Sequence, residues 1–427
     1  METATGAAAQ LREQWLNPND VSAVLMIIGG DVVRTALAQS TGTLFTPVCF
    51  SFGWVAYAFV ALIGVVGDGR LLPPPDFSVR VFNLDSGYSR ENKNWVIGRI
   101  LRDHEVSIVR AVGCEAGVHI AIYEAVSRGE PGIGFWTSFP YDRLHLFGLA
   151  AMVVQFGIAA IPATLYNDWT ILLVLAVGTV LALLHGALPQ WRAEKLPDRQ
   201  HSWGTFGLTT GNGSRDIMVV KDLGRCLNLE ELAATGTPRS SLPWRKFRKV
   251  PASIQAAAAS PGSSGNSNNT FFRRANTLLP VAKPVRGIPL GFWYTCAVTI
   301  FGSIAWMFLL VTVTAVRENR WYLLAVGGIG VFQNGITAAV ARPPKSRNLP
   351  LKLVDIITAK KTMDGLMDLQ DAHGCGWHLV GEFFPGELKA EEDAWWNGEK
   401  DAYDGKRRKE ACIRGLPYGD RLKKRSQ

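Results

Sequence analysis

The chain has 427 residues, a formal net charge of +9, and 48% hydrophobic against 19% charged residues. A soluble protein of this length would form two or three domains, but several nearly charge-free apolar runs exclude a wholly soluble chain. The positive charge does not indicate nucleic-acid binding, because it is concentrated beside those runs: residues 189–291 hold 15 Lys or Arg against 6 Asp or Glu.

The first 20 residues contain neither a basic region nor an early apolar core, so we expect no signal peptide. Residues 21–41 are apolar except near their middle, where a lone charge would cost about 2.5–3.5 kcal/mol. Asp31 and Arg34 stand three residues apart on one helix face and can partly neutralise each other. This favours a span over the alternative, an amphipathic segment on the membrane surface. With a second span at residues 47–66, residues 21–66 form the first predicted helical hairpin.

Residues 67–144 are predicted to be a cytosolic loop with helices. Alternating polarity predicts a strand over Phe77–Leu84, and residues 95–127 predict one or two helices. Val106–Val126 is apolar, but charged residues and His119 recur through it. We therefore expect a cytosolic or interfacial helix there.

Residues 145–188 form the second predicted hairpin. Its two apolar runs, 145–165 and 169–188, are separated by three residues. At about 1.5 Å per residue, each run can cross a hydrocarbon core about 30 Å thick. The third hairpin, residues 292–341, repeats this plan with a four-residue turn. Aromatic residues typical of a membrane interface stand at the ends of these runs: Tyr166, Trp169, Trp293, Tyr294, Trp321 and Tyr322.

Residues 189–234 are predicted to be a folded cytosolic segment. The stretch 206–220 predicts a β-hairpin that turns at Asn212-Gly213, and residues 227–234 predict a short helix. Residues 235–286 are rich in Ser, Pro, Ala and Asn and lack periodicity, which predicts a flexible linker.

The C-terminal segment, residues 342–427, predicts amphipathic helices at 353–370 and 385–414. Its 17 Lys or Arg exceed its 14 Asp or Glu. Because basic residues beside spans mark the cytosolic side, we place this tail and residues 189–291 in the cytosol. The scattered cysteines imply no disulfide framework.

The expected fold is an all-α integral membrane helical bundle of three hairpins, with five or six spans and a small α+β cytosolic cap formed by the long loops. The glycosylation sequons at Asn212 and Asn268 would then face the cytosol and stay unmodified. The membrane is predicted to be the plasma membrane or an endomembrane.

Four stretches together resemble one protein family: NPNDVSAVLMIIGGDVVRTALAQ (17–39), FSFGWVAYAF (50–59), VGDGRLLPP (66–74) and RPPKSRNLPLKLVDIITAKKTMDGLMDLQ (342–370). The chain is similar, apart from residues 235–286, to an uncharacterised family of multipass membrane proteins from filamentous ascomycete fungi. The resemblance implies a eukaryotic membrane location. It implies no activity, cofactor or site residue.

Polar residues at mid-span are the best functional candidates, because a bilayer interior penalises them. They are Asp31, Arg34, Gln155, Gln333 and Asn334, with His185 nearer a helix end. Facing a cavity, they would form a permeation route or a substrate site. The interpretation that we favour is hydrogen bonding between helices, with Asp31 and Arg34 as a structural pair.

Two other groupings favour ordinary structural roles. His373, Cys375 and His378 offer three metal ligands, but a structural zinc site needs four, so we expect neither metal nor cofactor. Glu115 and His119, with Glu124, would supply acid–base groups on one helix, but we favour their interpretation as the polar face of an amphipathic helix.

Two further motifs are weak. The Gly-rich stretch 210–214 precedes a strand, whereas a phosphate-binding loop precedes a helix, so a hairpin turn is favoured. The basic clusters 406–409 and 423–425 fit weak lipid contact or a solvated face.

The leading functional hypothesis is a non-enzymatic, membrane-anchored interaction or scaffold protein. Its partners would be the lipid bilayer and a cytosolic protein bound through residues 189–234 and 342–427, with no nucleic acid. The alternative is a small-solute transporter or channel that uses the mid-span polar residues. A membrane-embedded enzyme would need Glu115, His119 and His185 to converge at one membrane depth.

Overall fold

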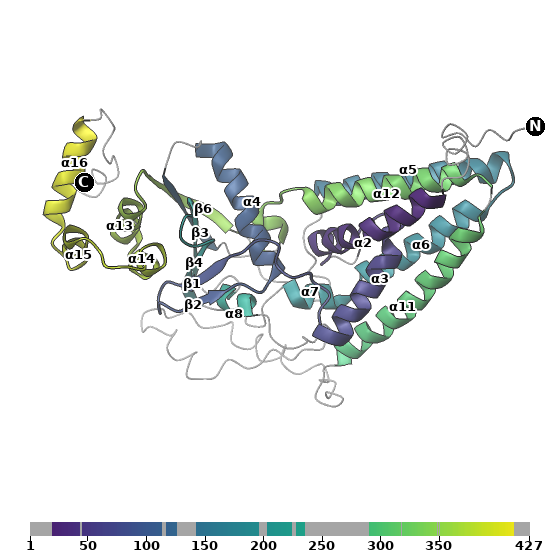
Figure 1. The fold of residues 1–427 in the computed structure, drawn as a ribbon, viewed down its shortest axis with the longest axis horizontal. Helices are drawn as coiled ribbons and strands as arrows, with labels where there is room; N and C mark the ends of the chain where they lie inside the picture. Colours follow the sequence, from purple (N-terminus) through teal and green to yellow (C-terminus); the bar gives the residue numbers. More distant parts are fainter. Residues whose placement is uncertain are drawn as a thin grey trace, which may run out of the picture.

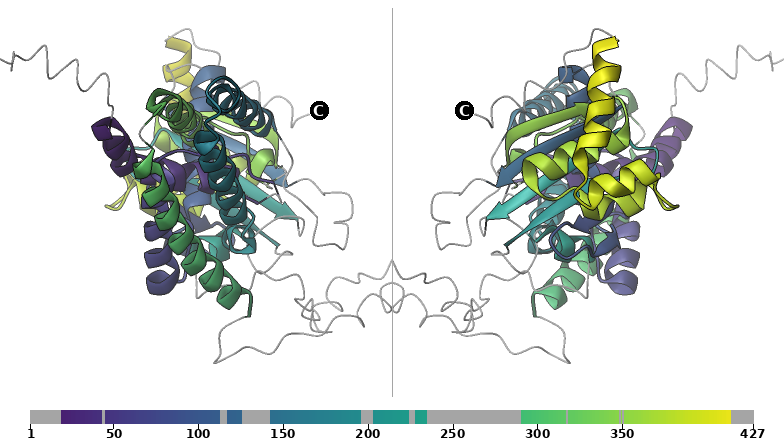
Figure 2. Two further views of the ribbon diagram at one scale, coloured as in Figure 1. Left: turned by 90° about the vertical axis from the view of Figure 1, so that its right-hand side faces the viewer. Right: turned by 90° about the vertical axis from the view of Figure 1, so that its left-hand side faces the viewer.

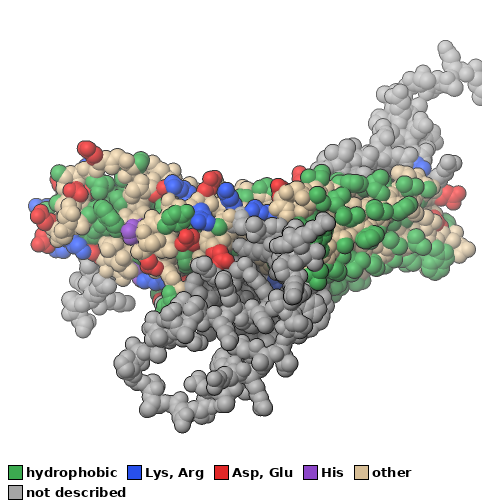
Figure 3. All heavy atoms as spheres, turned by 90° about the horizontal axis from the view of Figure 1, so that it is seen from below, with side chains coloured by type: hydrophobic (Ala, Val, Ile, Leu, Met, Phe, Trp, Pro, Cys, Tyr) green, Lys and Arg blue, Asp and Glu red, His purple; other side chains and the backbone are tan. Residues whose placement is uncertain are grey.

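The structure is a computed structural model, and it describes residues 19–42, 45–112, 117–125, 142–195, 203–223, 228–234, 290–316, 318–347, 349 and 351–413. The molecule is elongated, with a helical bundle at one end, a β-sheet in the middle and small C-terminal helices at the other end (Figure 1). On the face shown in Figure 3, hydrophobic side chains cover most of the visible bundle, whereas charged side chains are more frequent on the rest of the described surface.

Four helices in the described part of the chain are long and apolar enough to cross a membrane. They are α5 (Arg143–Leu165), α6 (Thr170–Gly186) with its continuation α7 (Pro189–Lys195), α11 (Leu290–Ala315) and α12 (Arg320–Ala339). These helices match the second and third predicted hairpins. The two connecting turns lie at the same end, where the Asn319 amide nitrogen donates to the Asp168 carboxylate at 3.1 Å.

The N-terminal region departs from the predicted hairpin. Helix α2 (Asn19–Ser40) is followed by a non-helical stretch, and helix α3 (Gly53–Ile63) begins six residues after Pro47 and continues into the π-helical turn η1 (Gly64–Asp68). The predicted continuous span at residues 47–66 is therefore wrong in its first part. Proline disfavours helix in the residue before it, which accounts for non-helical Thr46. Proline is tolerated in the first turn of a helix, so Pro47 alone does not account for the non-helical residues 48–52.

A six-stranded sheet forms the core of the cap, in the order β2-β1-β4-β5-β3-β6. Its neighbouring strands are antiparallel, except for the parallel pair β3–β5. The predicted strand near residue 80 and the predicted hairpin at Asn212-Gly213 are confirmed. The strands are β1 (Arg80–Asn83), β2 (Ser89–Glu91), β3 (Val118–Ala125), β4 (Trp203–Thr209), β5 (Asp216–Leu223) and β6 (Leu351–Ala359).

Two predicted helices are partly strands. Helix α4 (Trp95–Val112) is helical as expected, but β3 replaces the predicted helix at the end of Val106–Val126. Likewise, β6 occupies the first half of the predicted helix 353–370, and helix α13 (Thr362–His373) begins only after it. An apolar run buried on both faces lacks the period-2 signal of a strand, so periodicity cannot distinguish it from a buried helix.

The sheet is covered on both faces. Ile120, Ile122 and Val219 pack with α13 and α14 (Trp377–Phe383), while Met218 and Val220 belong to a core shared with α4, α8 (Leu229–Ala234) and the bundle. Helices α15 (Ala390–Trp396) and α16 (Lys400–Ile413) complete the C-terminal layer, which faces the viewer in the right-hand view of Figure 2. The cap is thus an α+β layer joined directly to the helical bundle.

Candidate functional site

Residues 45–52, called here the inserted segment, run without helical structure into the bundle. Val48, Cys49 and Phe50 are all at most 2% exposed. Phe50 contacts Gly178 and Gly330, which lie near the middle of α6 and α12. The segment therefore reaches the middle of the bundle, and α3 then leads the chain back toward the cap.

Three of the predicted candidates supply hydrogen bonds to this segment. Gln155 donates through Nε2 to the carbonyl oxygens of Phe50 at 2.8 Å and Val326 at 2.7 Å. Gln333 accepts from the Cys49 N–H at 3.2 Å and donates to the Pro47 carbonyl at 3.3 Å. Asn334 donates to the Cys49 carbonyl at 3.2 Å.

These amides satisfy a backbone that has no helical partners. An extended chain in an apolar environment must find donors and acceptors from its surroundings, because an unsatisfied backbone group there costs several kcal/mol. The Trp54 indole N–H adds a bond to the same Cys49 carbonyl at 2.9 Å. The favoured interpretation predicts hydrogen bonds between helices: the bond from Gln155 to Val326 joins α5 to α12, whereas the bonds to Pro47, Cys49 and Phe50 go to the non-helical inserted segment.

Glycines provide the space for the inserted segment. A Cβ added at Gly330 would lie 1.8 Å from the Phe50 carbonyl oxygen, and one at Gly148 would lie 2.2 Å from the Pro47 carbonyl oxygen. Gly178 and Gly327 meet the rings of Phe50 and Phe52 equally closely. Three of the four long apolar helices, α5, α6 and α12, thus each carry a glycine where the segment passes.

Asp31 and Arg34 lie apart from this cluster. Arg34 donates to the Leu72 carbonyl at 3.2 Å, toward the cap, whereas Asp31 is exposed. No ion pair joins them in the part of the chain that the structure describes. The predicted neutralising pair is therefore wrong: arginine reaches the backbone of the loop after α3 instead.

His185 occupies an aromatic core between α3, α6 and α11. Its ring lies 6.1 Å from Trp54 and 6.3 Å from Tyr57, measured between ring centroids, and it packs against Gly302. Nδ1 bonds the Leu181 carbonyl at 2.9 Å. The ring is thus a packed element of the bundle core.

The predicted acid–base group does not assemble. His119 lies on β3 and bonds Asp216 at 3.0 Å, and Glu124 follows five residues later on the opposite face of the strand. Glu115 lies outside the described residues. Because His119 sits in the sheet and His185 in the bundle core, the predicted enzyme constellation is not supported.

The other weak motifs also have structural roles. His373 contacts Lys221 at 2.9 Å and Asp355 at 3.5 Å, and His378 packs against Gly87. Among the described residues, no group of three or more His, Cys, Asp or Glu is placed to hold a metal ion. Lys406 pairs with Glu391 at 2.7 Å on the tail surface, and residues 423–425 lie outside the described residues.

Buried ion pairs join the bundle to the cap, and the sequence did not reveal them. Arg342 bonds Asp142 at 2.6 Å, and Arg347 bonds Asp103 at the same distance. Asp142 also caps α5 by accepting from the Leu144 N–H at 3.1 Å. Burial alone would raise the pKa of Asp142, but hydrogen bonds and charge from His145 and Arg342 hold that pKa well below its usual range. An acidic residue just before an apolar run was the one sequence signal for this cap.

Comparison of the chain with protein-family models, curated proteins and solved structures finds no match.

Exposed aromatic side chains gather at one end of the sheet. Tyr88 is 49% exposed, Trp377 is 50% exposed and Trp203 is 78% exposed. Contacts of neighbouring residues link them to the β1–β2 turn: Gly87, which precedes Tyr88, packs on His378, which follows Trp377, and the N–H of Thr205, two residues after Trp203, donates to Asp85 at 2.8 Å. We name Tyr88, Trp203 and Trp377 the aromatic patch.

Proposed function

We propose that the protein is a membrane-anchored interaction protein whose cap binds a cytosolic protein partner. The aromatic patch carries this proposal. Large aromatic side chains are enriched at protein–protein interfaces, where they supply much of the binding energy. Two of the three patch residues, Trp203 and Trp377, belong to the segments 189–234 and 342–427 from which the sequence predicts partner binding.

The proposed topology places the cap in the cytosol. Helices α5, α6, α11 and α12 cross the membrane, α2 makes a fifth crossing, and the inserted segment with α3 enters and leaves from the cap side. Non-helical backbone at membrane depth is tolerated where protein surrounds it, as here. The excess of basic residues in 189–291 supports the cytosolic side for the cap.

Cross-linking in intact cells tests the partner surface. The full-length chain is compared with the double variant Trp203→Ala plus Trp377→Ala, and with Leu353→Ala, an apolar side chain that is 43% exposed on β6. We expect the double variant to lose the specific cross-linked proteins and Leu353→Ala to keep them. An unchanged thermal unfolding midpoint controls for folding, and an unchanged set of cross-linked proteins in the double variant would reject the proposal.

The alternative of small-solute transport has one observation in its favour. The side-chain oxygens Gln155 Oε1 and Asn334 Oδ1 are buried and have no hydrogen-bond partner among the described residues. Flux into vesicles reconstituted with the parent, and with Gln155→Leu, Gln333→Leu and Asn334→Leu, tests this alternative. The transport hypothesis would be rejected if the parent protein gave no flux, or if the parent and the three variants gave equal flux.

A further inference from the structure

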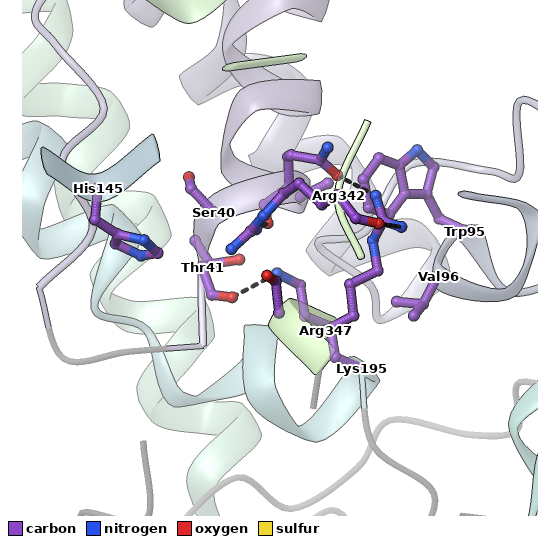
Figure 4. A pocket seen from close by; sticks show the side chains of 11 residues that line it. Ser40, Thr41, Trp95, Val96, His145, Lys195, Arg342 and Arg347 are labelled. Carbon is purple, nitrogen blue, oxygen red and sulfur yellow. Dashed lines mark hydrogen bonds between the residues drawn. The ribbon is translucent and has the colours of Figure 1, made fainter. Parts of the chain in front are cut away.

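A small cavity lies where the bundle meets the cap. Its volume is ≈ 10 Å³, at the lower limit of what a cavity needs to hold one water molecule. Five elements contribute to its wall: the end of α2, the start of α4, the start of α5, the end of α7 and the segment from Arg342 to Arg347 (Figure 4). These elements come from distant parts of the sequence, so only the assembled molecule contains the cavity.

Its wall is rich in hydrogen-bond donors. Lys195, Arg342 and Arg347 line it, each only 5% exposed, together with the polar residues Ser40 and Thr41. None of the described lining residues carries a carboxylate. The carboxylates of Asp142 and Asp103 bond Arg342 and Arg347 without lining the cavity.

The cations are held by the surrounding structure. One N–H of Lys195 donates to the Thr41 carbonyl at 2.5 Å, and Arg347 donates to the Gln39 side chain at 3.0 Å. Arg347 Nε is buried without a hydrogen-bond partner among the described residues. Burial lowers the pKa of Arg347 to about 10, which shows how strongly desolvation disfavours its charge. The Asp103 carboxylate, 2.6 Å from Arg347, offsets part of that cost, and a second anion in the cavity would offset more of it.

We propose that this cavity binds a phosphate group, with one non-bridging oxygen inside and the rest of the phosphate at its mouth. A phosphate oxygen is about the size of the water molecule that the cavity admits, and charged donors make its strongest hydrogen bonds. Basic pockets at the cytosolic ends of membrane helices suit lipid headgroups. The phosphate would therefore come from an anionic lipid or from free phosphate in the cytosol.

Thermal unfolding of the delipidated full-length protein in detergent tests the site. The probes are short-chain (dihexanoyl) phosphatidic acid, inorganic phosphate, dihexanoyl glycerol with the same chains but no phosphate, and sodium chloride at matched ionic strength. We expect phosphatidic acid or inorganic phosphate to raise the unfolding midpoint, and the other two probes to leave it unchanged. A rise with phosphatidic acid alone assigns a lipid source, whereas an equal rise with inorganic phosphate assigns free phosphate. Equal shifts with chloride, or no shift with either phosphate probe, would overturn the proposal.

Three variants check the location. Lys195→Met removes a charge, and Ser346→Leu fills the cavity without changing any charge; each should weaken phosphate binding about tenfold or more, the value of one charged hydrogen bond. Lys352→Met, which removes an exposed cation on β6, is the matched control and should bind like the parent. Parental affinity in both Lys195→Met and Ser346→Leu would place the phosphate elsewhere. If Lys195→Met does not fold, Ser346→Leu still decides.

Discussion

At the scale of single residues, three amide side chains meet the needs of a buried extended backbone. A primary amide both donates and accepts, so one Gln can bond an N–H and a carbonyl of the same segment, as Gln333 does with Cys49 and Pro47. A hydroxyl would be too short and a charge too costly at this depth. Amides therefore suit this position because they both donate and accept hydrogen bonds and carry no charge.

Substitution of Gln155 by Leu should destabilise the bundle by about 1–3 kcal/mol, because the Phe50 carbonyl would lose its buried donor. The free energy of unfolding in mixed detergent measures this loss. Thr164→Val is the control: Thr164 is exposed on the same helix and its hydroxyl bonds only its own helix, so its change should stay within about 0.5 kcal/mol. Equal effects from both substitutions would contradict the role given to Gln155.

His104 predicts a pH dependence of cap stability. Burial lowers its pKa to about 4, and its Nδ1 lies 3.1 Å from the Tyr123 hydroxyl. Because the folded pKa is below the unfolded value of about 6.5, the stabilisation is complete above about pH 6.5 and is lost as the pH falls toward 4. His104→Asn keeps an acceptor for Tyr123 but does not titrate. Unfolding midpoints from pH 7 to 4 should fall more steeply for the parent than for this variant; parallel curves would refute the assignment.

Sequence reasoning identified Gln155, Gln333 and Asn334 but could not identify their partners. The penalty on polar groups at mid-span is local and can be read from one helix. The hydrogen bond from Gln155 to Phe50 joins residues 105 positions apart, and no local pattern encodes that contact. For the same reason the sequence did not predict the ion pairs Arg342–Asp142 and Arg347–Asp103.

At the scale of elements, the inserted segment and its glycines form one unit. Gly330→Ala should strongly destabilise the protein, because the new Cβ would overlap the Phe50 carbonyl oxygen and the backbone would have to move. Gly328→Ala, two residues earlier on the same helix, is the matched control, since nothing lies within 4 Å of its added Cβ. We expect Gly328→Ala to be neutral or stabilising by up to about 1 kcal/mol. Thermal unfolding of both variants checks this, and a harmless Gly330→Ala would refute the packing described.

Element types were predictable where a turn motif or the periodicity of apolar residues distinguishes them. The β4–β5 hairpin was predicted because Asn212-Gly213 specifies its turn, and Gly213 has φ 91°. Strand β3 was not predicted, because both of its faces are buried and its sequence therefore lacks alternating polarity. Val118, Ile120 and Ile122 face one core, whereas Ala121 and Ala125 are buried on the other side. Pro47 stands at the first position of the second predicted span, where proline is tolerated in a helix, so it did not reveal the non-helical residues after it.

At the scale of the whole molecule, the proposed topology predicts which surfaces each side of the membrane can reach. Glu318→Cys places a thiol in the turn between α11 and α12, and Asn212→Cys places one in the cap; both positions are exposed. A membrane-impermeant maleimide added to intact cells should label Glu318→Cys, and should label Asn212→Cys only after permeabilisation. The parent chain, with its native cysteines, sets the background. The reverse labelling pattern would place the cap on the extracellular side and contradict the proposed topology.

The inserted segment also constrains how the protein is made. The Cys49 backbone can form its hydrogen bonds to Gln333 and Asn334 only after these residues, 284 and 285 positions later, have been synthesised. At about 5–20 residues per second, the ribosome needs on the order of 15–60 s to supply them. During that interval the segment cannot remain bare among lipid tails. The first helices of the nascent chain must therefore be shielded, or stay outside the hydrocarbon, until translation of the last hairpin completes the bundle.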